Sequence, residues 1–362
     1  REVGDKTNDS VRVDGADVRA KVVGEGGNLG VTQKGRIEFA LKGGLIDTDA
    51  IDNSGGVDCS DREVNLKILF GPMMAKGKMK FEQRNKVLKD ATSEVLDKIL
   101  QDNYGHALCL SLDEIRSKKD PYLFLWTSDF LKEKGLMKPA QEDLPSLADL
   151  QQRGIQHGLT RPELSKLMAF FKLYTKGELL PMEASKFPLK EDFLEHYFPA
   201  KVYKTYKQEI GSHMLLKEIL ATVWIGNIIN QAGPTFFTDL ISDTERNVQD
   251  IAFAYTACER WFNANVIKQQ IMESKHVSLH HRLEAFVEIE QMIKISASWA
   301  LHFFSGKTLY DKIGSGQSFK AEAVKYSKVL SDILKQIQHD PAYGQQLKTS
   351  TEKLIKIGRA HV

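Results

Sequence analysis

The sequence predicts two parts of different fold class: an α/β segment over residues 1–74 and a larger all-helical domain over residues 75–356. In the first part, short β-branched runs alternate with glycine-rich turns and a helical segment, which is typical of an α/β unit. After Gly71-Pro72 the chain shows helical periods with few β-branched runs. The last six residues, 357–362, read like a translated adapter sequence, so we interpret them as a non-native tail.

The α/β segment is predicted from the order of its elements. Residues 18–23 form an apolar, β-branched run that stops at Gly24, and this pattern predicts a short strand. Residues 32–41 then carry apolar side chains at helical spacing until Gly43-Gly44. A second glycine-rich turn follows at residues 53–57. We expect two such turns at neighbouring strand ends, where a doubly wound sheet presents its ligand.

The helical domain is predicted from capping signals and from helical periods. Thr160-Arg161-Pro162-Glu163 has the pattern of a capping box, in which Thr160 and Glu163 bond each other's backbone N–H groups. Proline in that first turn loses no needed hydrogen bond. Further helices are expected over residues 203–231, 243–272, 278–303 and 320–338.

Both glycine-rich turns carry an asparagine, and we interpret them as one half of a cofactor pocket. Glycine lets the backbone approach a ligand, and a carboxamide both donates and accepts, which suits a planar amide such as nicotinamide. The other half of the pocket is not expected in this chain. The alternative is a pair of tight turns without a ligand. The predicted cofactor-binding residues are Gly26, Gly27, Asn28, Asn53, Gly55 and Gly56.

Composition argues against several other functions. Fifty basic residues against 48 acidic ones give a net charge of only +2, so nothing favours nucleic acid. The apolar run over residues 219–229 is too short to span a membrane. The three cysteines, Cys59, Cys109 and Cys258, form no CxxC pair, which favours a reducing cytoplasm.

Two further motifs are weak. His276 and His280 are four residues apart, but no acidic or cysteine partner has ligand spacing, so no metal site is expected. Residues 305–308, SGKT, resemble the end of a P-loop, but the required earlier glycine is replaced by Leu301. We interpret both as ordinary surface features of helices.

Several segments together carry a family resemblance: GDKTND, RAKVVGEGGNLG, TQKGRIEFALKGG, DAIDNSGGVDCSDREVN and GLTRPELS. They resemble the C-terminal portion of the large NAD-specific glutamate dehydrogenases of bacteria. The resemblance implies that residues 1–74 end a catalytic, Rossmann-like dinucleotide-binding domain and that residues 75–356 form the helical C-terminal domain. It also implies NAD as cofactor and L-glutamate and 2-oxoglutarate as substrate and product. We further hypothesise that the helical domain buttresses the catalytic domain and contributes to a homo-oligomer, and the composition predicts no nucleic-acid or membrane partner.

The resemblance also implies roles for single residues. Asn28 would lie near the nicotinamide-side ribose, Asn53 near the nicotinamide amide, and Ser60 against the substrate side-chain carboxylate. For Ser60 the residues alone suggest a helix cap, because SDRE fits a capping box opening a helix over residues 61–70. The catalytic Lys and Asp of the family lie upstream of this segment. We therefore expect no catalytic residue here and no activity from the isolated chain.

Two alternatives remain open from the sequence. One is another amino-acid dehydrogenase with the same two turns, in which Ser60→Ala would leave turnover nearly intact. The other is a non-catalytic helical module that serves oligomerisation or regulation.

Overall fold

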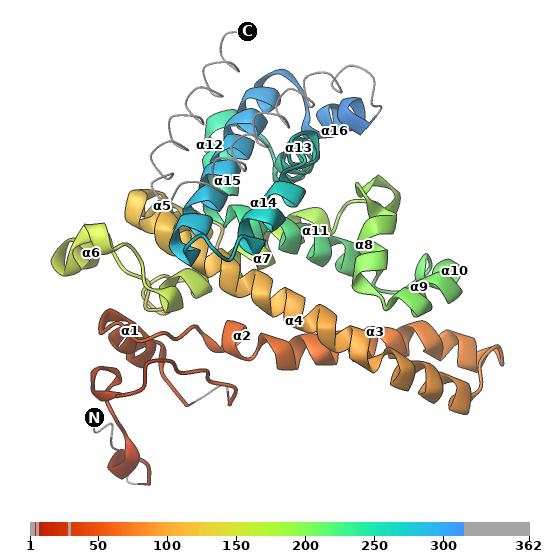
Figure 1. Ribbon diagram of the computed structural model, residues 1–362, viewed down its shortest axis with the longest axis horizontal. Coiled ribbons are helices and arrows are strands. Elements are labelled where there is room, and N and C mark those ends of the chain that lie inside the picture. Colours follow the sequence, from red (N-terminus) through yellow and green to blue (C-terminus); the bar gives the residue numbers. More distant parts are fainter. Residues whose placement is uncertain (1–3, 5–6, 28–29, 315–362) are drawn as a thin grey trace.

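The computed structural model describes residues 4, 7–27 and 30–314, and in these ranges every regular element is helical (Figure 1). The predicted α/β fold of the first part is therefore wrong. The predicted strand over residues 18–23 makes only one isolated parallel bridge, between Val22 and Leu45. No other described segment extends that bridge into a ladder, and a strand without neighbouring strands is not stable.

The helices of the first half are the 3-10 turns η1 (Asp9–Val11) and η2 (Gly15–Asp17), followed by α1 (Gln33–Leu41), α2 (Asp49–Asp52), α3 (Ser54–Ala75), α4 (Phe81–Lys119), α5 (Pro121–Glu133), α6 (Leu147–Arg153), η3 (Ile155–His157) and α7 (Arg161–Leu179). The second half contains η4 (Ala184–Lys186), α8 (Lys190–Tyr197), α9 (Ala200–Thr205), α10 (Lys207–Ile210), α11 (Leu216–Ala232), α12 (Thr235–Thr244), α13 (Val248–Trp261), α14 (Ala264–Glu273), α15 (Leu279–Phe303) and α16 (Gly306–Gly314).

Helix α4 forms the long axis between the two sides of the molecule (Figure 1). It packs against α3 on one side and against α7, α11 and α15 on the other. Its second half is buried at Cys109, Leu110 and Leu112 because helices surround it there. The helices α1, α2 and α3, which carry the predicted pocket, lie along the opposite side of α4.

The core of the helical domain centres on aromatic side chains. Trp224 is 1% exposed, and its ring packs edge-on against Phe253 and Phe187 at centroid distances of 5.0 and 5.7 Å. Its indole Nε1 donates a 2.8 Å hydrogen bond to the hydroxyl of Thr256, which satisfies the one polar group of the ring. Burial of these large rings adds to the apolar driving force that the aliphatic side chains of the core also supply.

The helical predictions were partly correct. The helix over residues 278–303 is confirmed as α15, and the capping box at Thr160 is confirmed at the start of α7. The helix predicted over residues 243–272 is interrupted at Glu245 and Asn263, where the backbone is left-handed with φ of 53°. Asparagine tolerates this conformation better than most residues.

The helix predicted over residues 203–231 is also interrupted. His213 lies between α10 and α11, accepts a 3.0 Å hydrogen bond from the backbone N–H of Leu215, and places its other ring nitrogen 3.0 Å from the carbonyl of Asn65 in α3. The run breaks first at Tyr206, between α9 and α10, and again between Ile210 and Leu216, where this tertiary contact lies. The predicted helix over residues 320–338 and the tail over residues 357–362 lie outside the described residues.

Candidate functional site

The two glycine-rich segments lie next to each other in the structure, but the second is not the predicted loop, because residues 54–57 form the first turn of helix α3. The backbone N–H of Glu25, in the first turn, donates a 3.3 Å hydrogen bond to the carboxylate of Asp52, which immediately precedes Asn53. Gly26 and Gly27 are exposed. Asn28 lies outside the described residues, so its predicted role stays a prediction. The turns are brought together by polar side chains, without the sheet that the sequence predicted.

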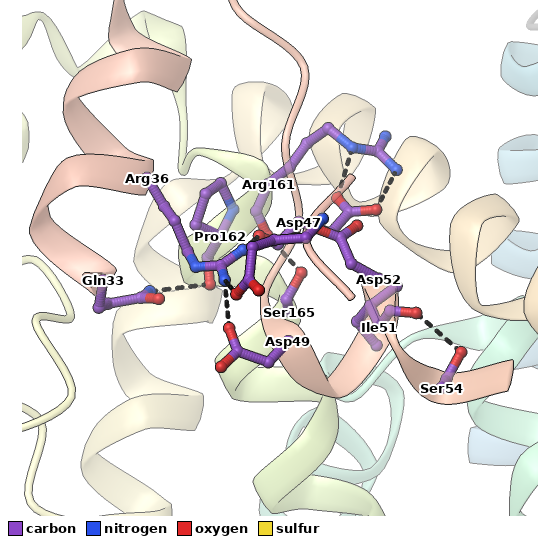
Figure 2. Close-up of polar contacts among 11 residues, drawn as sticks. Gln33, Arg36, Asp47, Asp49, Ile51, Asp52, Ser54, Arg161, Pro162 and Ser165 are labelled. Atoms are coloured by element: carbon purple, nitrogen blue, oxygen red, sulfur yellow. Dashed lines mark hydrogen bonds and ion pairs between the residues drawn. The ribbon is translucent and has the colours of Figure 1, made fainter. Parts of the chain in front are cut away.

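Arg36 of α1 joins the first turn to the segment before Asn53, and Figure 2 shows its side chain among Asp47, Asp49 and Asp52 of that segment. Its guanidinium donates to the carboxylate of Glu25 at 2.8 Å and to that of Asp52 at 3.4 Å. It also donates to the backbone carbonyl of Asp47 at 2.6 Å and to the carboxylate of Asp49. The side chain is 1% exposed, and a buried guanidinium is tolerated only with such partners. Burial raises the pKa of Asp52 above its usual value, although the Glu25 N–H and Arg36 act in the opposite direction.

Asn53 links α2 to α3, and α4 packs against the turn around it. Ser54 donates to the carbonyl of Ile51 at 2.8 Å and also to the carboxamide of Asn103 in α4. A Cβ at Gly55 would lie 2.9 Å from Asn103 Nδ2, and one at Gly56 would lie 2.7 Å from Asn53 Oδ1. Glycine is therefore needed at both positions to keep the two carboxamides in place.

Ser60 lies inside α3 and is exposed. Its hydroxyl donates to the carbonyl of Gly56 at 3.2 Å. The capping interpretation of Ser60 is wrong, because the helix has already begun at Ser54. Asn53 and Ser60 are seven residues apart, which places them on one helical face about 10 Å apart along the axis. That face carries the predicted cofactor end and the predicted substrate end.

Helix α7 holds the segment that leads into the second turn. Arg161 Nε donates to the carboxylate of Asp47 at 2.8 Å, and its Nη1 donates to Glu114 of α4 at 2.9 Å. The side chain of Gln33, at the start of α1, donates to the carbonyl of Pro162 at 3.1 Å. The helical domain thus contacts both α1 and the residues before α2 (Figure 2).

A second polar network lies beyond Ser60. Arg62 is buried and donates to Asp58 at 3.1 Å, to the carbonyl of Tyr197 at 2.7 Å, and to Asp102 of α4. Burial raises the pKa of Asp58 to about 6, and the nearby Asp102 adds to the effect against the opposing charge of Arg62. These contacts fix α3 against α4 and α8 and so fix the helix that carries Ser60.

A cavity of about 470 Å³ lies between α1, α2 and α7. Arg36 and Thr48 line one side, and Lys166 and Phe170 of α7 line the other. Thr48 is 4% exposed, and its hydroxyl has no hydrogen-bond partner. The cavity thus lies where α7 faces the start of α1 and the start of α2.

Sequence reasoning missed Arg36, Asp52 and Arg161. The sequence did indicate that a cation would be needed here. Asp47, Asp49 and Asp52 fall within six residues, and three carboxylates so close together require a nearby positive charge. Which arginine supplies that charge depends on a tertiary contact that composition does not show.

Two further features concern membranes and metals. Among the described residues, no helix is long and apolar enough to cross a membrane. Within the same part of the chain, no group of three or more His, Cys, Asp or Glu side chains is arranged to hold a metal ion.

The structure brings the first glycine-rich turn next to the residues before Asn53 and attaches this region to the helical domain through Gln33 and Arg161. The family model of the bacterial NAD-glutamate dehydrogenase catalytic domain matches residues 1–113, and that of the glutamate dehydrogenase C-terminal region matches residues 156–356. The chain therefore belongs to the bacterial NAD-glutamate dehydrogenase family. The matched ranges do not test the predicted domain boundary at residue 74, which stays a prediction.

Curated relatives agree with this assignment. The chain is 37% identical to the NAD-specific glutamate dehydrogenase of Halomonas elongata over 316 residues, which is 86% of this chain and 20% of that protein. It is 37% identical to the enzyme of the same name from Mycobacterium tuberculosis, over 83% of this chain and 19% of that protein. The match to the one from Pseudomonas aeruginosa is 40% identical over 70% of this chain and 16% of that protein. The chain thus spans at most about a fifth of these relatives.

Proposed function

We propose that this chain supplies the nicotinamide end and the substrate-carboxylate end of the active site in an NAD-dependent glutamate dehydrogenase. The reaction is L-glutamate, NAD⁺ and water giving 2-oxoglutarate, ammonium, NADH and a proton. A hydride leaves the α-carbon of glutamate for the nicotinamide ring, and water then replaces the nitrogen of the resulting imine. The base and electrophile for these steps come from outside residues 1–362, so the isolated chain is expected to be inactive.

The arrangement of α3 is the observation that carries this proposal. Asn53 stands at the start of the helix and Ser60 lies two turns later on the same face, which is exposed at Gly56 and Ser60. An amide at one end suits the nicotinamide carboxamide, and a hydroxyl at the other suits a carboxylate. A separation of about 10 Å leaves room for the two reactants side by side. Asn28 would complete the cofactor end from the adjacent turn.

Glutamate-dependent NADH formation by the full-length polypeptide, compared with its Asn53→Ala variant, tests the proposal. Loss of one hydrogen bond to bound cofactor costs about 1–3 kcal/mol, which is roughly a 5- to 150-fold loss of activity. Glu63→Ala is a matched control, because Glu63 is exposed on the same helix and forms an ion pair with Lys67, which is also exposed. An inactive wild-type protein, or an Asn53→Ala variant as active as the control, would contradict the proposal.

The substrate assignment is tested separately at Ser60. Ser60→Ala is expected to raise the KM for glutamate by about 10-fold and to change the KM for NAD little, because a charge-assisted hydrogen bond is lost. If the substrate is another amino acid, this variant keeps its turnover of that amino acid. We also propose a cytoplasmic homo-oligomer, for which the mass of the full-length protein at several concentrations is the test.

A further inference from the structure

Arg36 is the side chain that binds both glycine-rich turns. It reaches Glu25 of the first turn and Asp52, the residue directly before Asn53, from a position inside α1. Helix α1 is itself anchored at its start: Thr32 caps it, and Gln33 bonds the carbonyl of Pro162. The guanidinium therefore fixes the distance between two backbone segments that are about 27 residues apart in the chain.

The carboxylates around Arg36 make the distance between the first turn and Asp52 depend on the positive charge of the guanidinium. Glu25, Asp49 and Asp52 all point toward it, and the carboxylate of Asp47 is turned away to Arg161. Without Arg36, three carboxylates would face one another in a poorly hydrated space, where like charges repel strongly. The first turn and the start of α2 would then move apart.

We infer that Arg36 is a positioning residue that sets the separation between the Gly26–Gly27 turn and Asn53, and thereby the affinity for the nicotinamide cofactor. This inference rests on the proposed function. Arg36 does not touch the reacting atoms in this arrangement. It acts through Glu25 and Asp52, so its removal weakens cofactor binding more than it changes the substrate end at Ser60.

The test is Arg36→Lys in the full-length protein, with the KM values for NAD and glutamate, kcat and direct NADH binding by calorimetry. Lysine keeps the charge but offers a single ammonium group, which cannot reach acceptors on both turns with the geometry of a guanidinium. We expect the KM for NAD and the NADH dissociation constant to rise about 10- to 100-fold. The KM for glutamate should change less than threefold.

Arg116→Lys is the matched control. Arg116 is also largely buried, with a 13% exposed side chain, and it bonds Asp113 at 2.8 Å and the carbonyl of Gln231 at 2.6 Å. These partners lie in α4 and α11, away from both turns. A general loss of stability would affect the control in the same way as Arg36→Lys, whereas a positioning role affects only the latter.

A rescue experiment separates repulsion from misfolding. In the Arg36→Met background, Asp52→Asn removes one of the three facing carboxylates and keeps a side chain of similar shape. We expect the double variant to bind NADH more tightly than Arg36→Met alone, although Asp52→Asn by itself weakens binding. Such non-additivity is the mark of residues that act together. If the double variant is no better than Arg36→Met, the repulsion argument is overturned.

The outcomes also separate this inference from the proposed function. A wild-type protein that binds NADH but does not oxidise glutamate contradicts the proposed reaction, while the Arg36 role is still judged from the dissociation constants. Equal cofactor affinity in Arg36→Lys and Arg116→Lys overturns the positioning role and leaves the reaction intact. A wild-type protein that binds no NADH overturns both.

Discussion

The region before α3 and the helical domain are stabilised by different forces. Around Arg36 and Arg161 the first region is held by ion pairs and hydrogen bonds, and apolar side chains such as Val22 and Leu45 remain more than half exposed. The helical domain instead buries an aromatic core around Trp224 and Phe171. The hydrophobic effect is not directional, whereas hydrogen bonds and ion pairs have preferred geometries and so fix the atoms that they join. The candidate site lies where directed contacts dominate.

Trp224→Ala should give the largest effect, because it removes a fully buried ring from the apolar side of this comparison. Truncation of a buried aromatic residue costs about 3–5 kcal/mol in transfer and cavity terms. Chemical denaturation of the chain measures it. Trp299→Ala is the control, since Trp299 is 42% exposed and should cost under about 1 kcal/mol. Equal losses in the two variants would mean that the aromatic core does not dominate stability.

Arg161→Met should loosen the first region without unfolding the helical domain. The variant leaves the carboxylates of Asp47 and Glu114 without their cation. Because solvent partly screens both ion pairs, we expect the free energy of unfolding to fall by about 1–3 kcal/mol. Hydrogen exchange should then become faster in residues 20–52 and stay unchanged around Trp224. Lys207→Met, which removes an exposed ion pair with Glu191, is the control. Uniformly faster exchange would contradict the division into two regions.

Lys172 of α7 tests how the helical domain tolerates a charge. Its ammonium donates to the carboxamide of Asn230 at 2.6 Å, and burial lowers its pKa to about 8. The lysine of the unfolded chain has a pKa near 10.5, so the unfolded state binds this proton more tightly than the folded state does. Raising the pH from 8 to 10 removes the proton and therefore increases the free energy of unfolding. The free energy of unfolding of wild type minus that of Lys172→Met should increase by on the order of 1–3 kcal/mol across this range. A constant difference would show that the ammonium is hydrated.

The helical part of the fold was readable because its signals are local. The capping box at Thr160 and the apolar period of α15 act within a few turns of chain, and both predictions are confirmed. Predictions that depended on distant contacts were less successful. The helix predicted over residues 203–231 breaks at Tyr206 and again after Ile210, and the second break is next to His213, which contacts Asn65 far away in the sequence.

The strand prediction was wrong for a related physical reason. The β-branched run over residues 18–23 has the local preference of a strand, but a strand is stabilised by its neighbours. Only the single bridge from Val22 to Leu45 is present among the described residues. Without a partner strand, residues 18–23 stay irregular despite their local preference for a strand, and ion pairs then determine where this segment lies.

Family membership and the positions of the two asparagine-bearing turns follow from the order of residues alone, because both are properties of short, contiguous segments. The contacts that hold the turns together, the burial of Arg36 between them and the attachment of α7 through Arg161 do not. Each of these joins residues that are separated in the chain, and the sequence contains several arginines that could neutralise the same carboxylates. The packing of α1, α4 and α7 selects among them, since only a side chain brought within hydrogen-bond distance and shielded from water can hold the site together.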